Sequence, residues 1–298
     1  MAALTGADRI LAETLPAIAR EVDAMFDALL PAEGKLAKAM RHAAIGGGKR
    51  LRPLLLTATA TMHGADRTNA LRAAIAIEAI HAYSLVHDDL PCMDDDAMRH
   101  GKPSTHTAFG YAEAVLAGDA LQSFAFEVLA DPATSGDPFV RAELVLVLAS
   151  AAGAQGMVGG QMLDIDGEGQ ALDLPAVTRM QQLKTGALLS AAVEMGAVLG
   201  KLPPEGRMHL RGYARDIGLA FQIADDLLDH AGDEAKAGKA LRKDAAAGKQ
   251  TFVGLLGEGR AREQARMLVD QALAYLNSYG QEADLLRAVA RYIVERDR

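Results

Sequence analysis

Two groups of aspartates, far apart in the chain, could hold metal ions. The first group lies in the stretch 81–101, at the end of an apolar run, and comprises Asp88, Asp89, Asp94, Asp95 and Asp96. The second group lies in 221–229 and comprises Asp225, Asp226 and Asp229. So many like charges repel one another unless cations lie between them, and oxygen ligands suit Mg²⁺. The two groups therefore predict a metal site shared by the ends of two helices.

The spacing within each group indicates which carboxylates can face that site. Asp225 and Asp229 are four residues apart, so they share one face of a helix. In an unbroken helix, Asp88 and Asp94 would point in different directions. Pro91 lies between them and would clash with the carbonyl four residues back, so we expect the helix to end or kink there. This break would allow both side chains to reach one metal cluster.

A basic segment in the first quarter of the chain could bind an anion. Gly46-Gly47-Gly48 precedes Lys49-Arg50-Leu51-Arg52-Pro53. Glycines permit a tight turn and proline is tolerated in a first helical turn, so we expect Lys49 and Arg52 at a helix N-terminus, where free N–H groups can meet an anion. The spacing is not that of a Walker loop. On these residues alone, a solvated basic turn is an equally good interpretation.

Further along the chain, single residues suggest smaller features. His81 and Asp88 are seven residues apart and share a helical face, with Ser84 between them. Gly186, which follows Lys184 and Thr185, predicts a local kink in its helix. The stretch 232–249 is charged and rich in Ala and Gly, which predicts a basic lid or, alternatively, a plain solvated loop.

Helices must position all of these residues. Ala and Leu are abundant, aromatic residues make up 4% of the chain and Trp is absent, which favours packed helices over a β-sandwich. We find no convincing strand, and we expect residues 101–106 to form a loop. The chain 1–298 is predicted to be a single all-α domain. The expected helices cover 5–30, a segment ending near 45, 53–63, 68–90, 107–130, 138–163, 174–199, 205–230, 250–256, 260–277 and 282–296.

Composition excludes several classes of protein. The net charge of −8 does not favour nucleic acid or an anionic membrane as a partner. The single Cys92 excludes an intramolecular disulfide and a multi-cysteine zinc site. Asp8 and Glu13 interrupt any signal-peptide core, and the most apolar run, 144–154, is shorter than the ~20 residues that span a bilayer. We therefore expect a cytoplasmic protein without stable membrane insertion.

The inventory of side chains suggests the chemistry. No Ser-His-Asp or Cys-His nucleophile system is evident. Carboxylates reach a phosphate through Mg²⁺, which binds both groups and neutralises their charge. A largely apolar interior suits an apolar tail. A diphosphate head on a hydrocarbon chain satisfies both requirements.

The sequence resembles the short-chain trans-prenyl diphosphate synthases, and most closely the bacterial farnesyl diphosphate synthases. The resemblance covers nearly the whole chain. It rests on the motifs at 47–53, 88–94 with Arg99, 160–164, 184–185, 221–229, 248–249 and 292–298. It implies an isoprenoid-synthase-type helical bundle around a deep central cavity, assembled as a homodimer.

The resemblance also implies roles for residues. Three Mg²⁺ would be held by Asp88, Asp94 and Asp225, with Asp89, Asp229 and Asp164 in support. The allylic diphosphate would be held by Arg99, Lys184, Thr185, Gln222, Lys239 and Lys249. Isopentenyl diphosphate would be held by Lys49, Arg52 and His81, with Arg298 closing that site.

The implied reaction is ionisation, condensation and elimination. The allylic C–O bond breaks, the isopentenyl double bond attacks the cation, and a proton is lost to the bound diphosphate. Thr185 and Gln222 would present oxygens to the cation. Tyr83, which lies ~7.5 Å along the helix axis from Asp88, would form a floor that stops the chain at C15. Ser84 is the second residue assigned to chain length, and ordinary helix packing is the alternative role of Tyr83.

One position departs from the family pattern, which usually has Arg-Arg where this chain has Arg99-His100. If His100 contacts isopentenyl diphosphate, its charge would depend on pH, since an unperturbed histidine titrates near ~6.5. We then expect the KM for isopentenyl diphosphate to rise above neutral pH.

Three other functions remain as alternatives. A geranylgeranyl diphosphate synthase (C20) would use the same scaffold, although Tyr83 argues against it. A terpene cyclase would not need a second site for a diphosphate. A non-catalytic regulatory subunit would be expected to have lost acidic or basic positions that are present here.

Overall fold

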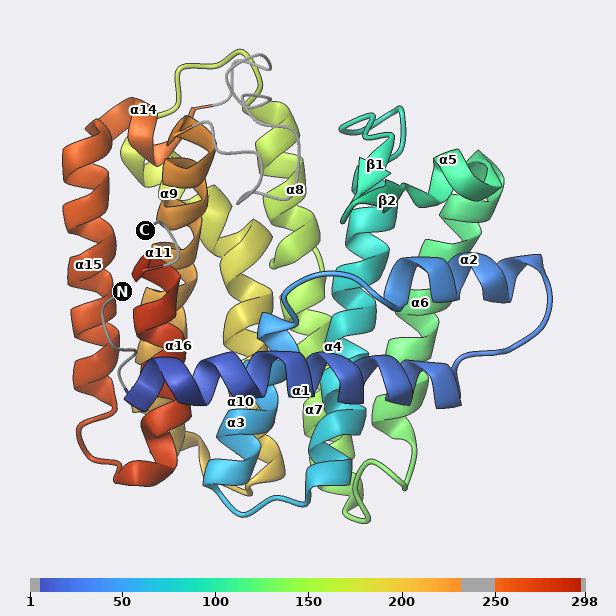
Figure 1. The fold of residues 1–298 in the computed structure, drawn as a ribbon, viewed down its shortest axis with the longest axis horizontal. Helices are drawn as coiled ribbons and strands as arrows, with labels where there is room; N and C mark the ends of the chain where they lie inside the picture. The colour runs from blue at the N-terminus through green and yellow to red at the C-terminus, as the bar shows by residue number, and fades with distance from the viewer. Residues whose placement is uncertain (1–5, 232–249, 296–298) are drawn as a thin grey trace.

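The computed structural model describes residues 6–231 and 250–295, and they form an all-α fold (Figure 1). The first half contains α1 (Gly6–Leu29), α2 (Lys35–Ala44), α3 (Leu51–Met62), α4 (Arg67–Asp88), β1 (Met98–Arg99), β2 (Lys102–Pro103), α5 (Thr105–Phe109), α6 (Tyr111–Ala130) and α7 (Pro138–Ala152). The second half contains α8 (Met157–Asp166), α9 (Leu174–Gln181), η1 (Gln182–Gly186), α10 (Ala187–Leu199), η2 (Pro204–Arg207), α11 (Met208–Ala231), α14 (Phe252–Leu256), α15 (Glu258–Tyr275), η3 (Gln281–Ala283) and α16 (Asp284–Glu295).

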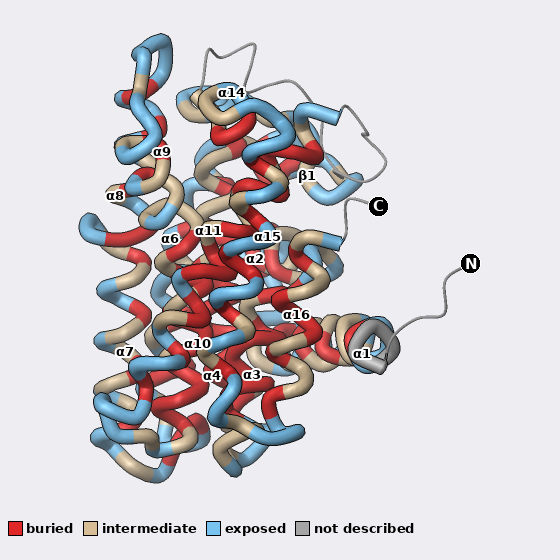
Figure 2. Tube along the Cα trace, turned by 90° about the vertical axis from the view of Figure 1, so that its left-hand side faces the viewer, coloured by how far each residue is buried: buried red, intermediate tan, exposed pale blue. Residues whose placement is uncertain are grey.

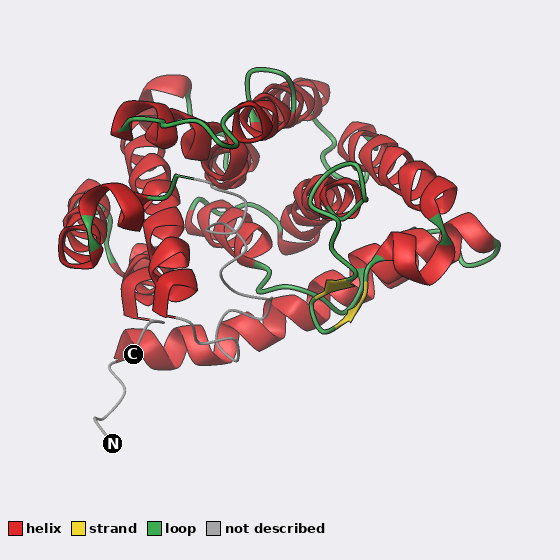
Figure 3. Cartoon of the chain, turned by 90° about the horizontal axis from the view of Figure 1, so that it is seen from above, coloured by secondary structure: helices red, strands yellow, loops and turns green. Residues whose placement is uncertain are grey.

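Most of the helices run side by side, and α1 crosses them. Figure 1 shows α1 lengthwise across the front of the upright helices, and Figure 2 shows it nearly end-on. Figure 3, seen from above, shows most of the other helices end-on, with the small hairpin of strands at one side. The layout is a helical bundle with α1 lying across one face of it.

The core lies along α3, α4, α10 and α11, where the buried residues concentrate (Figure 2). Nearly every position of α4 from Ala70 to Tyr83 is buried, on all sides of the helix. A helix that is apolar all round belongs in the interior. Accordingly, α4 packs against α3, α6, α10 and α1. This central helix carries the first aspartate group at its C-terminal end.

Local sequence fixes where several helices begin. Asp66 accepts hydrogen bonds from the backbone N–H groups of Thr68 and Asn69 and caps α4. Asp137 caps α7, and Pro138 follows in the first turn. Such caps satisfy N–H groups that have no partner within the helix.

The predicted helix 138–163 is wrong, because the chain breaks between α7 and α8. Gly153 and Gly156 lie in the break, and a Cβ at Gly156 would come within 2.1 Å of the Ala151 carbonyl oxygen. By length and composition, Pro138–Asp166 is the one stretch in the described residues apolar enough to cross a membrane, and 28% of its apolar 18-residue window is buried. In the structure this stretch is two helices tied to the bundle, where Glu143 and Asp164 form ion pairs.

The predicted loop at 101–106 and the absence of strands are also corrected. Met98 pairs with Pro103 and Arg99 with Lys102 in an antiparallel hairpin, and α5 begins at Thr105. His100 and Gly101 occupy the turn with φ of 51° and 76°. Positive φ at both central residues is typical of a tight hairpin turn, and histidine tolerates it better than most residues. The predicted lid at 232–249, with Lys239 and Lys249, lies outside the described residues, as does Arg298.

Candidate active site

A cavity of about 690 Å³ lies at the end of α4 and is lined by α3, α4, the hairpin, α8, α9, η1 and α11. This volume is ample for a ligand of moderate size. The lining includes most of the predicted site residues, namely Lys49, Arg52, His81, Asp94, Arg99, His100, Asp164, Lys184, Thr185, Gln222, Asp225 and Asp229. The structure thus brings together residues that are up to 180 positions apart in the sequence.

The chain folds back on itself after Asp88, as Pro91 predicted. α4 ends at Asp88, and the N–H of Asp94 donates to the Asp88 carbonyl oxygen at 2.8 Å. The N–H of Asp96 likewise donates to the Asp89 carbonyl oxygen at 3.1 Å. The turn therefore returns Asp94 to the end of the helix, beside Asp88.

The environment of Asp88 disfavours its charged form. Burial raises the pKa of the Asp88 carboxyl to about 6, and Asp94 and Asp89 add to this rise. Lys184 and Arg99 act in the opposite direction. A carboxylate held in this state gains from a nearby cation, because the cation offsets both the burial and the like charges.

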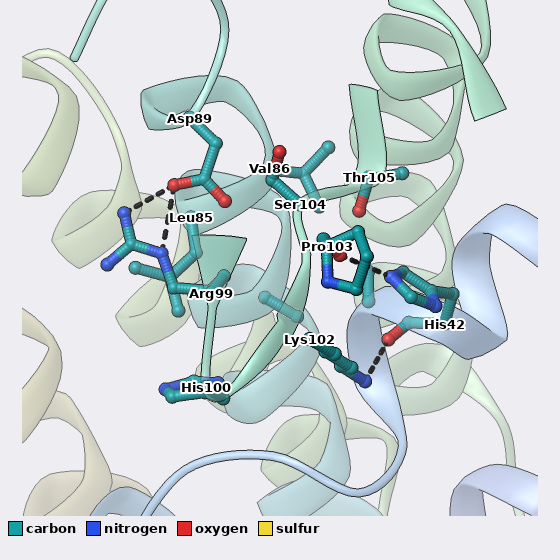
Figure 4. Close-up of a pocket in the computed structure, with 12 residues that line it drawn as sticks. His42, Leu85, Val86, Asp89, Arg99, His100, Lys102, Pro103, Ser104 and Thr105 are labelled. Atoms are coloured by element: carbon teal, nitrogen blue, oxygen red, sulfur yellow. Dashed lines mark hydrogen bonds and ion pairs between the residues drawn. The ribbon is translucent and has the colours of Figure 1, made fainter. Parts of the chain in front are cut away.

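Asp89 and Arg99 form an ion pair at the edge of the cavity. The guanidinium of Arg99 donates to Asp89 Oδ1, at 2.9 Å from Nε, as shown in Figure 4, a close-up of a smaller pocket that shares Arg99 with the cavity. Arg99 also donates to Asp96 Oδ2 at 3.1 Å. Asp89 is 2% exposed, and burial raises the pKa of its carboxyl against the effect of Arg99. Asp89 and Asp96 thereby orient Arg99, which also lines the cavity.

The second aspartate group divides into two roles. Asp225 and Asp229 line the cavity from α11, on the shared face that their spacing predicts. Asp226 also reaches the lining, but its Oδ2 accepts a hydrogen bond from the Phe252 N–H at 2.8 Å. Asp226 therefore anchors the start of α14 to α11.

The donor set fits Mg²⁺, although within 6–231 and 250–295 no three acidic, His or Cys side chains converge closely enough to hold a metal by themselves. Asp88 and Asp94 lie at one cluster, and Asp225 and Asp229 at the other. Mg²⁺ commonly takes one or two protein carboxylates, with water and substrate phosphate at its other positions. The arrangement suits metal ions that arrive together with a phosphate ligand.

The glycine loop and the hairpin form the basic side of the cavity. Gly46 and Gly48 have φ of 74° and 73°, and α3 begins at Leu51, so Lys49 and Arg52 flank a helix N-terminus as predicted. Lys102 Nζ donates to the carbonyl oxygens of Ile45, at 2.9 Å, and His42, which ties the hairpin to this loop (Figure 4). A Cβ at Gly47 would come within 2.8 Å of His100 Nδ1, so only glycine lets the imidazole pack there.

The two histidines of this basic side favour their neutral forms. Burial lowers the pKa of His81 well below its usual value, and Arg52 and His100 lower it further. Burial, Arg99, Arg50 and Lys102 together lower the pKa of His100 to about 4. The pKa of His100 thus lies below the value of ~6.5 on which the sequence expectation was based, and its role toward isopentenyl diphosphate stays a prediction.

Lys184 and Thr185 lie on η1, a turn of π-helix, where the sequence predicted a kink. Turns of π-helix are rare in proteins overall, and those that occur are often found at functional sites. Lys184 Nζ donates to Asp164 Oδ2 at 2.6 Å. A Cβ at Gly160 would come within 2.1 Å of the Lys184 backbone nitrogen, so this glycine allows α8 to approach η1.

Tyr83 and Ser84 lie on α4 but are not part of the described cavity lining. The Tyr83 ring is 6% exposed and meets the His87 ring edge-on at 5.7 Å between centroids. Ser84 donates to the His81 carbonyl oxygen at 2.9 Å. Their role in product length stays a prediction.

Sequence reasoning missed Glu78 and the anchoring of Arg50. Glu78 lines the cavity one helical turn before His81, and Arg50 is buried against it. The three-residue spacing to His81 could have placed Glu78 on the right face. No local signal could have shown that Arg50 and Arg52 have different partners.

Comparisons with known proteins agree with this geometry. The family model described as polyprenyl synthetase matches residues 33–292. The chain is 46% identical over 282 residues to a farnesyl diphosphate synthase of Escherichia coli (strain K12), covering 92% of this chain and 93% of that protein. It is 43% identical over 278 residues to a chloroplastic geranylgeranyl pyrophosphate synthase of Catharanthus roseus, covering 92% and 78%. An apo FPP/GFPP synthase structure from Zymomonas mobilis has a TM-score of 0.87 and 51% identity, covering 95% of this chain and 98% of that one.

Proposed function

The chain belongs to the polyprenyl synthetase family, and from this membership we propose that it is a prenyltransferase that makes farnesyl diphosphate. It joins isopentenyl diphosphate to dimethylallyl diphosphate and then to geranyl diphosphate, which gives a C15 chain. The observation that carries this proposal is one cavity whose lining holds both a group of carboxylates, here called the acidic side (Asp94, Asp225 and Asp229), and a group of basic residues, here called the basic side (Lys49, Arg52, His81 and His100). One side suits an allylic diphosphate with its metal ions, and the other suits a second diphosphate without them.

Mg²⁺ would be held by Asp88 and Asp94 from one cluster and by Asp225 from the other, with three ions in each site. When bound, Mg²⁺ supplies positive charge that stabilises a departing diphosphate. Asp89 and Asp229 support these ligands, and Asp164 keeps Lys184 in place through the 2.6 Å ion pair. Lys184 and Arg99 provide the fixed positive charge of the chain itself on this side.

The other residues of the cavity bind the second substrate and protect the cation. Lys49, Arg52, His81 and His100 face the diphosphate of isopentenyl diphosphate. Thr185 and Gln222 present oxygens toward the allylic carbon as its C–O bond breaks, which stabilises developing positive charge. The cavity walls exclude water, which would otherwise quench the cation. The proton released at the end passes to the bound diphosphate, so no separate base is needed.

The proposed enzyme is a cytoplasmic homodimer, and its exposed apolar side chains support the dimer. Exposed apolar side chains lie on the adjacent helices α6, α7 and α8 and include Tyr111, Leu116, Phe139, Leu146, Val158 and Met162. Apolar surface of this kind is typical of protein interfaces. It supports a homodimer formed through these helices. The anionic, water-soluble substrates support a cytoplasmic location, and a net charge of −8 gives no support for nucleic acid as a partner.

The test is product analysis with purified protein. Isopentenyl diphosphate, dimethylallyl diphosphate and Mg²⁺ are incubated with the protein, and the products are dephosphorylated and sized. We expect farnesol. Geranylgeraniol would keep the reaction and replace the product, as the similarity to C20 synthases would then suggest. Absence of condensation at every Mg²⁺ concentration would contradict the proposal and favour a regulatory subunit. Cyclic hydrocarbons formed in a parallel incubation with farnesyl diphosphate would contradict it and favour a cyclase.

Replacing Tyr83 with alanine tests the length of the product in the same assay. Removing the ring opens space beside α4, so we expect products of C20 and longer. Ser84→Ala changes the second position assigned to chain length, and we expect a smaller effect because it removes a single hydroxyl that bonds to the His81 carbonyl. If Tyr83→Ala still makes farnesol alone, Tyr83 does not limit the length of the product, whereas the proposed reaction is unaffected.

A further inference from the structure

Arg50 and Arg52 are two residues apart at the start of α3, yet their surroundings are opposite. The guanidinium of Arg50 is held at both terminal nitrogens, since it donates to Glu78 Oε1 at 2.9 Å, Asp23 Oδ1 at 2.7 Å and the Ala44 carbonyl oxygen at 2.7 Å. Arg52 lines the cavity, and its buried Nε has no acceptor among the described residues. Arg50 therefore belongs to the framework, whereas Arg52 is left to meet a ligand.

Glu78 is an acid on the basic side of the cavity. It is 3% exposed and lines the cavity together with Arg50, Arg52 and His81. Its Oε1 accepts from Arg50, whereas its Oε2 is buried without a hydrogen-bond partner in the described part of the chain. Buried carboxylate oxygens are nearly always partnered, because an unpaired one loses its hydration without compensation. Such an atom in a cavity wall requires an explanation.

The missing partners of Glu78 and Arg52 complement each other. Arg52 Nε–H is a donor without an acceptor, and Glu78 Oε2 is an acceptor without a donor, in one cavity wall. Burial lowers the pKa of Arg52, and Glu78 is the leading group that opposes this effect, so the two charges already attract one another. A diphosphate is anionic and would not itself bind Glu78. The oxygen is therefore available to Arg52.

We propose that Glu78 is a positioning residue for isopentenyl diphosphate: it fixes Arg50 with one oxygen and receives Arg52 Nε–H with the other when the substrate binds. This inference rests on the proposed function. With Nε held by Glu78, the terminal nitrogens of Arg52 point to the diphosphate as a fork, which is the geometry in which guanidinium binds phosphate best. Because Arg50 already neutralises Glu78, the carboxylate repels the diphosphate little.

The test compares Glu78→Gln with the wild-type protein. The amide keeps one acceptor but presents an NH₂ where the second oxygen was, so one of the two arginines meets a donor. We expect the KM for isopentenyl diphosphate to rise about tenfold, the size of one charge-assisted hydrogen bond. We expect the KM for geranyl diphosphate to stay within about twofold, because that substrate binds on the acidic side.

Asp23→Asn is the matched control. Asp23 is the other carboxylate partner of Arg50, and it lies on α1, away from the cavity lining. If Glu78 only stabilises Arg50, Glu78→Gln and Asp23→Asn both have a lower melting temperature, and neither has a changed KM for isopentenyl diphosphate. That result, or a KM for isopentenyl diphosphate that falls in Glu78→Gln, overturns the inference. Failure of the wild-type protein to condense its substrates would instead overturn the proposed function.

A double-mutant cycle with Arg52→Lys gives a second, independent readout. Lysine keeps the charge but has no Nε–H in that position, so it cannot use Glu78 Oε2 as arginine does. We expect the double variant to have a KM no higher than that of Arg52→Lys alone. Additive effects would contradict the inference. If Glu78→Gln does not fold, Glu78→Asp replaces it, since it keeps the charge beside Arg50 and its shorter arm cannot serve both arginines.

Discussion

The acidic and basic sides of the cavity are opposites in charge but respond to the same physics. Burial and like charges raise the pKa of Asp88 to about 6 on one side, and burial and like charges lower the pKa of His100 to about 4 on the other. In both cases the surroundings oppose the charged form of the side chain. Each side also gains from a ligand of opposite charge, which is the metal on one side and the diphosphate on the other. The comparison teaches that burial can prepare one cavity for ligands of both charges, even though ion pairs such as Arg99–Asp89 and Arg50–Glu78 lie in its wall.

The two sides differ in what their internal ion pairs can do. On the acidic side, the partners of Asp89 and Asp164 are Arg99 and Lys184, and both cations can also meet a phosphate. On the basic side, the partner of Arg50 is Glu78, and this carboxylate cannot bind a phosphate because both carry negative charge. An acid placed among phosphate-binding groups is useful only through its neighbours. This asymmetry is why Glu78 is assigned a positioning role.

The largest effect is expected from neutralising the acidic side. Asp88→Asn removes a carboxylate that would hold Mg²⁺, and we expect kcat/KM to fall at least about a thousandfold, equivalent to about 4 kcal/mol of transition-state stabilisation. Steady-state assays over a range of Mg²⁺ concentrations measure it. A fall in kcat/KM of less than tenfold would contradict the assignment of Asp88 as a ligand of Mg²⁺.

The same variant should stabilise the metal-free protein. The folded pKa of Asp88, about 6, exceeds the unfolded value of 3.8, so ionisation favours the unfolded chain. Below about pH 3.8, Asp88 is protonated in both states and does not change the free energy of unfolding. Above about pH 6, its ionised carboxylate lowers the free energy of unfolding by up to about 3 kcal/mol. Asn avoids this cost. We expect Asp88→Asn to unfold at higher denaturant concentration at pH 7.5 in EDTA.

The gain in stability should shrink as the pH falls toward 4, because the wild-type carboxyl then becomes neutral in both states. Asp95→Asn is the matched control, since it makes the same change at an exposed position in the same turn. Equal unfolding midpoints for Asp88→Asn and the wild type at pH 7.5 would contradict the buried state of Asp88.

The smallest effect concerns His100 on the basic side. Its pKa of about 4 means that the empty site carries a neutral imidazole at neutral pH, and a bound diphosphate favours the charged form. Binding therefore takes up a proton in a window that begins near pH 4 and extends to the pKa in the complex. Within this window we expect the KM for isopentenyl diphosphate to rise with pH, by at most about tenfold per pH unit.

His100→Arg and His100→Asn sharpen this prediction. Arginine stays charged and asparagine stays neutral, so both should give a flat profile of KM against pH, with the lower KM in the arginine variant. Asparagine also tolerates the positive φ of 51° at this turn. A wild-type profile in either variant would exclude His100 as the group that takes up the proton.

Much of the fold and the acidic site could be predicted because their signals are local. Pro91 ends α4, and the spacing of Asp225 and Asp229 sets a shared face, whatever the rest of the chain does. The break between α7 and α8 was missed because the run from 138 to 163 is largely apolar, so its hydrophobic pattern does not change at the break. The hairpin was missed because two-residue strands leave no alternation in the sequence.

By itself, the sequence determined the types and spacing of the charged groups and the places where helices begin and end. The tertiary structure decided how those groups differ. Arg50 and Arg52 are near neighbours with the same side chain, but Glu78, 28 residues beyond Arg50, and Asp23, 27 residues before it, engage the first and leave the second to the cavity. The pKa of Asp88 was likewise set by burial and by Lys184, which lies 96 residues further along the chain. The reason is physical: partners and burial are supplied by distant parts of the chain, and they exist only after folding.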